Sequence, residues 1–249
     1  MVPQQVRIEL DDYSYPLLFV TIAGPHLYGF PSSNTPYNLH GTHVLPLREL
    51  VGLELGPEQL EHAVLRGGVE LRISTNDIKP FFGLLLRRNG STLEQLYSPL
   101  VARTTVEHRE LKHITRSCIT RYHSHHYIGV AETQWRVFTK EHVHSVLPLL
   151  EVFRALLTGI HLMRTGEIEA DLLRLNETFG LSYLPELVGQ QREDDKAMLG
   201  ATNDVQFYQQ EYDRLQNALE QAFHATSLPD APTGRAALHD LLLRLRLPS

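Results

Sequence analysis

The sequence predicts an α+β fold, a mixed sheet with flanking helices followed by a helical subdomain. Short apolar or alternating runs, typical of strands, gather in roughly the first hundred residues. After about residue 104, apolar residues recur with the 3.6-residue period of helices. Strands first and helices afterwards favour this class over alternating βαβ units. We expect an α+β domain over 1–104, a helical subdomain over 105–200 and a C-terminal helical extension over 201–249.

Three strands are predicted in the first part. Residues 16–24 (PLLFVTIAG) form an apolar, β-branched run that ends in glycine, which indicates a buried strand followed by a tight turn. Residues 37–45 (YNLHGTHVL) alternate between polar and apolar. Residues 69–73 (VELRI) alternate so that the apolar side chains share one face, and Glu70 and Arg72 share the other.

Two helices should follow these strands. Residues 77–88 have helical periodicity, and Asn89 with Gly90 is expected to end this helix. Ser91 and Glu94 match a capping box, which predicts a second short helix that opens there.

The rest of the chain is predicted to be helical. Residues 146–164 and 204–223 each have one apolar helical face, and 229–234 (PDAPTG) is a linker-like break. The last predicted helix, 236–245, is rich in leucine, and we expect those leucines to pack on the domain or on a partner.

Composition narrows the class of protein. The chain has 249 residues, 42% of them hydrophobic, and a net charge of −6. An acidic balance argues against a general basic coat for nucleic acid, although a local basic patch is compatible with it. Cys118 is the single cysteine, so an internal disulfide framework is excluded.

No targeting or membrane segment is expected. Residues 1–10 carry Arg7 and Glu9 and no apolar run, unlike a signal peptide. The most apolar stretch, 146–163, contains Glu151, Arg154 and His161, which favour a buried amphipathic helix over a membrane span. We expect a soluble, cytoplasmic protein.

The segment Ala23–Arg48 (AGPHLYGFPSSNTPYNLHGTHVLPLR) carries a motif. It resembles the polymerase-β superfamily and, within it, the nucleotidyltransferases associated with RNA repair and RNA ligases. Their pattern is Gly-Ser-x-x-Tyr-Gly, then about half a dozen residues, then Ser-Asp-x-Asp-x-Arg-Gly. This chain matches it at Gly24, Tyr28, Gly29 and Gly41. Further similar segments at 78–100 and 156–167 extend the resemblance over roughly residues 16–190, and it implies a cleft that the helical subdomain completes.

The chemistry implied by this resemblance depends on carboxylates. In nucleotidyl transfer, two Mg²⁺ ions about 3.5–4 Å apart clamp the attacking and leaving oxygens. Mg²⁺ prefers hard oxygen ligands. Two aspartates at i and i+2 of one strand share a face and can hold both metals, and a third acid comes from a neighbouring strand. The Gly-Ser turn offers backbone N–H groups and a hydroxyl to the phosphates.

In this chain the three acids are replaced. By alignment with the pattern, the first Asp is Pro36, the second is Asn38, and the third acid falls at Arg72. Proline has no side-chain oxygen, the amide offers one neutral oxygen, and a guanidinium repels Mg²⁺. The resemblance therefore implies a degenerate active site with no confident catalytic residue, no metal site and no expected cofactor.

The positions around the acids differ too. The Ser of Gly-Ser is Pro25, which has neither hydroxyl nor N–H, and the Arg before the final Gly is His40. Thr35 keeps the hydroxyl of the Ser that precedes the first Asp. The resemblance makes seven residues candidates for nucleotide binding, namely Gly24, Tyr28, Gly29, Thr35, Asn38, Arg72 and Arg154.

Two of these arginines have alternative interpretations. Arg72 could form a salt bridge at the sheet surface, or could replace a metal by binding a phosphate in a bidentate fashion. Arg154 lies in an otherwise apolar helix, and it could line the nucleotide cleft or pair with a structural acid.

A histidine cluster, His123, His125 and His126, looks like a metal tract but lacks further ligands at a suitable spacing. A helix start or a cleft-lining role is the alternative. Together with these histidines, Arg116, Arg121 and Tyr122 could contact RNA by charge and stacking.

Three hypotheses about function follow. The first is a pseudoenzyme that binds a nucleotide or RNA, in RNA repair or defence. The second is an active nucleotidyltransferase that transfers a nucleoside monophosphate to RNA or protein with Mg²⁺ as cofactor, held by other ligands such as Asn38, Glu70 and Asp77. The third is a structural partner of an active homologue or of an RNA ligase.

We predict that the purified protein binds Mg²⁺ no better than a generic acidic surface, because the carboxylates on which such sites depend are replaced. Calorimetric titration with Mg²⁺, with and without nucleotide, measures this. A stoichiometric Mg²⁺–nucleotide site would contradict the prediction.

Overall fold

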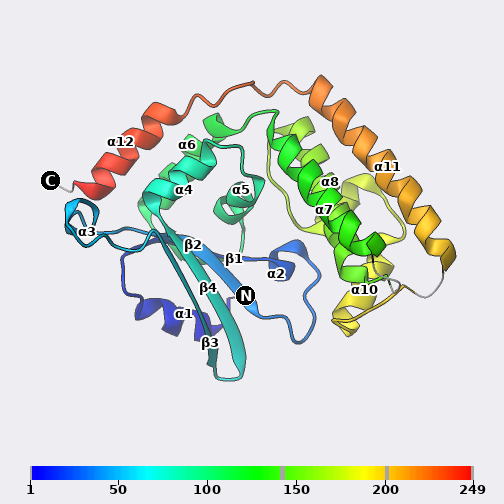
Figure 1. Ribbon diagram of the computed structural model, residues 1–249, viewed down its shortest axis with the longest axis horizontal. Helices are drawn as coiled ribbons and strands as arrows, with labels where there is room; N and C mark the ends of the chain where they lie inside the picture. Colours follow the sequence, from blue (N-terminus) through cyan, green and yellow to red (C-terminus); the bar gives the residue numbers. More distant parts are fainter. Residues whose placement is uncertain (1, 141–143, 200–201, 248–249) are drawn as a thin grey trace. The chain divides into compact units, whose positions relative to one another are not determined.

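The computed structural model describes residues 2–140, 144–199 and 202–247 (Figure 1). The chain divides into two compact units. The sheet unit comprises Met1–Leu27, Pro36–Ile119 and Ala231–Ser249, and the helical unit comprises Tyr28–Thr35 and Thr120–Asp230. The three-part division predicted from the sequence, with boundaries after residues 104 and 200, stays a prediction, because compactness alone does not test which segments fold independently.

Within the described residues, the sheet unit contains one five-stranded mixed sheet of order β3-β4-β2-β1-β5. β2 pairs in parallel with β4, and the other neighbours are antiparallel. This confirms the predicted α+β class. The strands are β1 (Leu17–Ala23), β2 (Tyr37–His43), β3 (Gln59–Arg66), β4 (Val69–Asp77) and β5 (Val101–Thr104).

One face of the sheet is covered by α1 (Gln4–Asp11), which is drawn in dark blue at the lower left of Figure 1. Val6 and Leu10 of this helix belong to one buried cluster with apolar side chains of the strands, and these are Val20, Ile22, Leu39, Leu71 and Ile73. Val20 and Ile22 of β1 are two residues apart, and so are Leu71 and Ile73 of β4. This spacing is expected because alternate side chains of a strand point to the same face.

The other face of the sheet is covered in part by α4 (Ile78–Leu85), α5 (Gly90–Tyr97) and α6 (Val106–Thr115). The ring of Phe19 packs edge-on against Phe81 and is stacked on His108, with ring centroids 5.5 and 4.3 Å apart. Thr21 donates a hydrogen bond from its hydroxyl to the carbonyl of Gln95 at 2.8 Å. These contacts lie over β1, and α4 and α5 also contact β2. The sheet unit also contains α2 (Pro25–Tyr28, whose last residue belongs to the helical unit), α3 (Arg48–Val51), η1 (Arg116–Cys118) and α12 (Arg235–Arg246).

The helical unit is organised around α8 (Val146–Thr165). This helix packs against α7 (His123–Lys140), α9 (Leu172–Phe179), α10 (Leu184–Glu193) and α11 (Thr202–Ala225). By length and composition α8 could cross a membrane, but 78% of its most apolar window is buried inside the protein. It is therefore a buried core helix, as the sequence predicts.

The predicted capping box at Ser91 and Glu94 is wrong. The N-cap of α5 is Asn89, whose side-chain oxygen accepts a hydrogen bond from the N–H of Thr92 at 3.1 Å. Asn89 satisfies a free N–H of the first turn, as an N-cap residue should, so Gly90 begins α5 and does not end the preceding helix.

A buried ion pair joins α12 to the end of β4. Asp77 accepts a hydrogen bond from Lys79 N–H at 3.0 Å as the N-cap of α4, and another from Leu45 N–H at 3.1 Å. Both of its carboxylate oxygens also accept from the Arg246 guanidinium, which in addition donates to the carbonyl of Leu45. The side chains of Asp77 and Arg246 are 2% and 6% exposed. The last helix is thus tied to the sheet by a buried, hydrogen-bonded charge pair.

We predict that Arg246→Ala lowers the free energy of unfolding by about 3–5 kcal/mol, because it leaves the Asp77 carboxylate buried without its countercharge. Urea denaturation measures the loss. Arg244→Ala is the matched control, since Arg244 lies on the same helix and its pair with Glu110 is exposed. Equal denaturation midpoints for the two variants would contradict the prediction.

Candidate functional site

Polar side chains gather on the sheet face opposite α1, over β2, β4 and β3. Asn38 is the direct partner of Arg72, and His40 is the direct partner of Ser74. Ser74 in turn is opposite Glu61. Directly paired residues of neighbouring strands point to the same side of a sheet. We call this set the polar face, and its members are Asn38, His40, Glu61, Glu70, Arg72 and Ser74.

The predicted placement of the degenerate positions is confirmed by this register. Asn38 and Arg72 lie side by side on the adjacent parallel strands β2 and β4. Pro36 comes directly before β2, two residues from Asn38. The alignment that put the third acid of the family pattern at Arg72 is therefore consistent with the geometry of the sheet.

Arg72 forms a surface ion pair. Its Nε donates to Oε1 of Glu70 at 2.7 Å, and the side chains are 59% and 45% exposed. Of the two interpretations offered for Arg72, the surface salt bridge is the one present in this structure. Exposed pairs of this kind stabilise a fold little.

The acids on the polar face are Glu61 and Glu70. Glu61 accepts hydrogen bonds from Gln59 Nε2 at 2.7 Å and from Ser74 Oγ at 3.3 Å. Its strand partner Ser74 is four residues along β4 from Glu70, which corresponds to about 13 Å along the strand. Two metal ions of a transferase site lie only about 3.5–4 Å apart. These two carboxylates therefore do not fit a shared two-metal site.

Over residues 2–140, 144–199 and 202–247, no group of three or more histidine, cysteine, aspartate or glutamate side chains could hold a metal ion. The Mg²⁺ that the family pattern implies does not fit the donors that the polar face presents.

The alternative ligand set of Asn38, Glu70 and Asp77 is wrong as a set. Asp77 is seven residues from Glu70 on the same strand, so it points to the opposite face. Its carboxylate is engaged by Arg246 and by the first turn of α4. It cannot join the other two around one ion.

His40 supplies a neutral donor where the family pattern has a guanidinium. Its Nδ1 lies 2.9 Å from Nε2 of Gln95. Because an amide nitrogen donates, Nδ1 accepts, and the proton of the neutral ring is on Nε2. Burial lowers the pKa of His40, and the negative charge of Glu61 opposes this only in part. The polar face thus lacks a second fixed positive charge at this position.

The glycine turn before α2 fits closely against β2. Gly24 has a φ of +66°, and a Cβ added there would lie 2.7 Å from Nδ2 of Asn38. The carbonyl of Gly24 accepts from Leu27 N–H at 2.9 Å, which starts the short helix with Pro25 at its first position. Gly24 and Asn38 are therefore in contact, next to Arg72.

The other predicted nucleotide-binding residues belong to the helical unit. Arg154 is buried, its guanidinium carbon lies 3.8 Å from the ring centroid of Tyr28, and its Nε donates to Glu151 at 2.8 Å. Pairing with a structural acid, one of the two interpretations of Arg154, is therefore present. It also anchors a tyrosine of the family motif by a cation–π contact.

The segment after Tyr28 is held by further contacts within the helical unit. Gly29 has a φ of +88°, and a Cβ there would lie 2.7 Å from Oδ1 of Asp171. Its carbonyl accepts from Arg192. The hydroxyl of Thr35 accepts from the N–H of Ser32 at 2.9 Å and so closes the loop. In this structure these motif residues have structural contacts, and their predicted role in nucleotide binding stays a prediction.

The histidine cluster opens α7. Nδ1 of the buried His123 lies 3.2 Å from the N–H of Thr120, and the ring of His125 packs against Tyr122 and Phe223. Arg121 donates to carbonyl groups of the segment after α11 and pairs with Asp230. These contacts agree with the predicted helix start.

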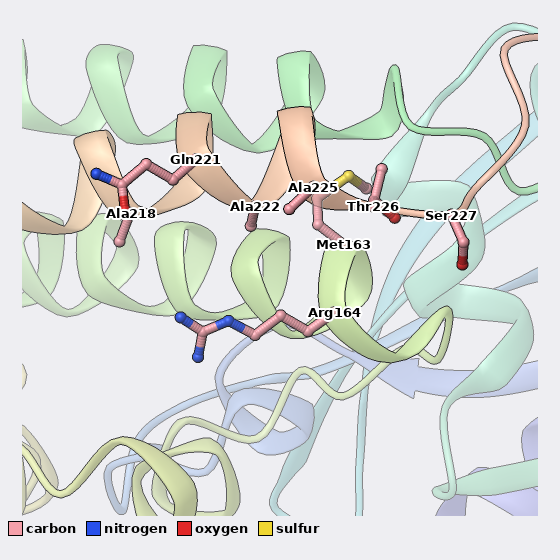
Figure 2. Close-up of a pocket in the computed structure, with 8 residues that line it drawn as sticks. All are labelled: Met163, Arg164, Ala218, Gln221, Ala222, Ala225, Thr226 and Ser227. Atoms are coloured by element: carbon pink, nitrogen blue, oxygen red, sulfur yellow. The ribbon is translucent and has the colours of Figure 1, made fainter.

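A hollow of about 410 Å³ lies in the helical unit between α8 and α11 (Figure 2). It is lined by Met163, Arg164 and six residues of α11 and its end. None of the predicted nucleotide-binding residues is among them. The Arg164 guanidinium points away from the other labelled side chains in Figure 2 and lies 5.6 Å from the ring of Phe179. This hollow is not part of the candidate site.

Comparison with known proteins agrees with the motif. The model of the family described as "RlaP: RNA repair pathway DNA polymerase beta family" matches residues 4–244. The chain belongs to this family. The resemblance found in the sequence is thereby confirmed over nearly the whole RlaP-type chain.

An uncharacterized protein from Methanocaldococcus jannaschii is 26% identical over 154 residues, which are 62% of this chain and 63% of that protein. The match thus spans less than two thirds of that relative. The crystal structure of a nucleotidyltransferase-like protein from Exiguobacterium sibiricum aligns with 89% of this chain and 74% of that one, at 12% identity and a TM-score of 0.35. A likeness at that score does not establish a shared fold.

Sequence reasoning missed Glu61, because it did not predict β3. A signal was present, since Gly67-Gly68 separates β3 from β4 by two residues, and both have positive φ. Two glycines between extended runs are typical of a two-residue hairpin turn. That turn places Glu61 beside β4.

We predict that Gly24→Ala destabilises the protein more than Gly68→Ala does. Both positions have positive φ, +66° and +78°, and each substitution should cost about 1–2 kcal/mol for that reason. Only the Cβ at Gly24 also meets Asn38, whereas the Cβ at Gly68 would have no atom within 4 Å. Urea denaturation of both variants measures the difference. Equal losses would show that Gly24 does not contact Asn38.

Proposed function

We propose that this RlaP-family protein binds a phosphate group of a nucleotide or RNA at its polar face and does not catalyse metal-dependent nucleotidyl transfer. The observation that carries the proposal is the pairing of Arg72 with Asn38 at the positions where the family pattern has two of its three acids. The proposal includes a role in RNA repair, which the family description supports, and a cytoplasmic setting.

The argument for phosphate binding rests on charge. In the family pattern, carboxylates hold metal ions, and the metal ions face the phosphates. A guanidinium at the same position can meet a phosphate directly, with two parallel hydrogen bonds. Arg72 is exposed, and its recorded contact among the described residues uses Nε, which leaves its terminal nitrogens for a ligand.

The argument against catalysis rests on what stabilises the transition state. Phosphoryl-type transfer depends on positioned positive charge that compensates the attacking and leaving oxygens. On the polar face Glu61 of β3 is opposite Ser74, which is four residues along β4 from Glu70, so the two carboxylates are too far apart for a metal pair. Pro25 lacks the N–H that the phosphate turn of the pattern would offer, and His40 is neutral where a guanidinium would stand.

Glu70 should restrain the affinity of this site. Its carboxylate occupies Arg72 and repels a phosphate that approaches. A bound phosphate must therefore displace the ion pair, and the free energy of binding is reduced by that exchange. Glu70 would set the affinity and would not act as a metal ligand.

The hypothesis of an active transferase predicts a different experimental result. Magnesium-dependent transfer of label from an α-labelled nucleotide to RNA or to protein, by the unmodified chain, would overturn the proposal. The absence of transfer combined with nucleotide or RNA binding supports it.

We predict that Arg72→Gln weakens binding of a nucleoside triphosphate and of a 5′-phosphorylated oligoribonucleotide by about tenfold or more, because one charge-assisted contact is lost. Glu70→Gln should strengthen both, since it frees the guanidinium. Calorimetry without Mg²⁺ measures the affinities.

Arg103→Gln is the control for that experiment. Arg103 lies on β5 of the same sheet and forms an exposed pair with Asp11 at 2.8 Å, similar to the pair of Arg72. The Arg103→Gln variant should bind the nucleoside triphosphate and the oligoribonucleotide with the affinity of the parent protein. If Arg72→Gln and Arg103→Gln lower the affinity equally, the effect is one of net charge and the polar face is not the site.

A further inference from the structure

A second candidate binding surface lies elsewhere in the sheet unit. A groove of about 1010 Å³ runs between α4 and α12. Its floor is apolar, and the main side chains are Pro80, Phe82, Leu84, Leu86, Leu238 and Leu242. None of these residues belongs to the polar face, so the groove is a separate feature of the molecule.

Positive charges surround this floor. Lys79, Arg87, Arg235 and His239 line the groove and are exposed, and Glu58 is the acid among the lining residues. Three cations against one acid give a local charge of +2 with histidine neutral, whereas the whole chain carries −6.

These cations are also free of protein partners. None of the four side chains forms a hydrogen bond or an ion pair with another described residue. By contrast, the exposed arginines Arg72, Arg103 and Arg244 of the same unit each pair with a carboxylate. The groove therefore concentrates unpaired positive charge on a protein that is acidic as a whole.

The helix α4 presents a glycine to the groove. A Cβ added at Gly83 would have no atom within 4 Å, so packing inside the protein does not require glycine there. Glycine in a helix interior costs roughly 0.5–1 kcal/mol relative to alanine. Its small size lets the backbone of another helix approach closely, as small residues do at helix–helix contacts.

From these observations we propose that the groove binds an amphipathic helix of a partner protein, with apolar residues facing the floor and carboxylates facing Lys79, Arg87 and Arg235. Amphipathic helices bind grooves in this way through anchors at i, i+3 or i+4, and i+7. The 12 residues of α12 extend over about 18 Å, which matches about three turns of a partner helix. An apolar floor suits side chains of leucine type better than the phosphates of a nucleic acid. This inference does not depend on phosphate binding at the polar face.

The probe for this proposal is a designed, fluorescently labelled helix of about 12–14 residues. It has leucines on one face and glutamates elsewhere, and a second peptide has the same leucines with lysines in place of the glutamates. Fluorescence anisotropy with the full chain measures both affinities. We expect the acidic peptide to bind, the basic one to bind at least about tenfold more weakly, and salt to weaken the acidic peptide's binding.

Two variants locate the binding to the groove. Gly83→Leu fills the groove at a position with free space. This substitution should lower the affinity for the acidic peptide by about tenfold or more. The combination Lys79→Glu, Arg87→Glu and Arg235→Glu should reverse the preference, so that the basic peptide binds better. Circular dichroism and thermal melting verify that each variant is folded.

A matched triple variant controls for net charge. Arg7→Glu, Arg109→Glu and Arg136→Glu change the same number of exposed cations outside the groove, and the acidic peptide should bind this protein as it binds the parent. The proposal is overturned if both peptides bind with equal affinity or if Gly83→Leu has no effect on the affinity. It is also overturned if the acidic peptide does not bind at millimolar concentration. Groove-dependent binding of RNA or of anionic vesicles, in place of the peptide, overturns it too.

Discussion

The parallel pairing of β2 with β4 is the constraint on which the candidate site depends. Because Asn38 pairs with Arg72, every second residue from these two along their strands belongs to the polar face. A shift of one residue would turn each of those side chains toward α1. The opposite face prevents this shift, since Leu39, Leu71 and Ile73 are buried in the core under α1. At the far end of β4, Asp77 is held by Arg246 and by the first turn of α4, which anchors the strand a second time.

This constraint also means that the fold does not depend on the residues at the three acid positions of the family pattern. The core is built by residues on the α1 face and by the contacts of Phe19 over β1, and neither involves Pro36, Asn38 or Arg72. Three carboxylates packed together without metal would repel one another and raise one another's pKa. Replacing them with a proline, an amide and a guanidinium removes that repulsion. The positions are thus free, in terms of stability, to take on the phosphate contact that we propose.

The sequence predicted those parts of the fold in which burial leaves a pattern. β1, β2 and β4 have buried faces, and their apolar or alternating runs were identified from the sequence; α8 was identified from its helical apolar periodicity. β3 was not predicted, because it is the edge strand and most of its side chains are exposed on both faces. Its alternation is therefore weak, and Glu61 was missed with it. The start of α5 was assigned wrongly because Asn89 and Ser91 are both good cap residues, and the sequence alone does not show that Arg88 takes the positive φ that lets Asn89 be the cap.

The site was predictable in its positions but not in its contacts. The family motif located Asn38 and Arg72, and the register places them side by side. Local sequence does not show that Arg154 stacks on Tyr28 or that Gly29 fits against Asp171, because these contacts join segments more than a hundred residues apart. They give the Tyr-Gly of the motif a structural role within the helical unit. A motif residue that has a structural contact can be kept for that contact alone, so its presence is no argument for catalysis. The argument has to come from the acids, and on the polar face the acids that remain are too far apart to hold two metal ions.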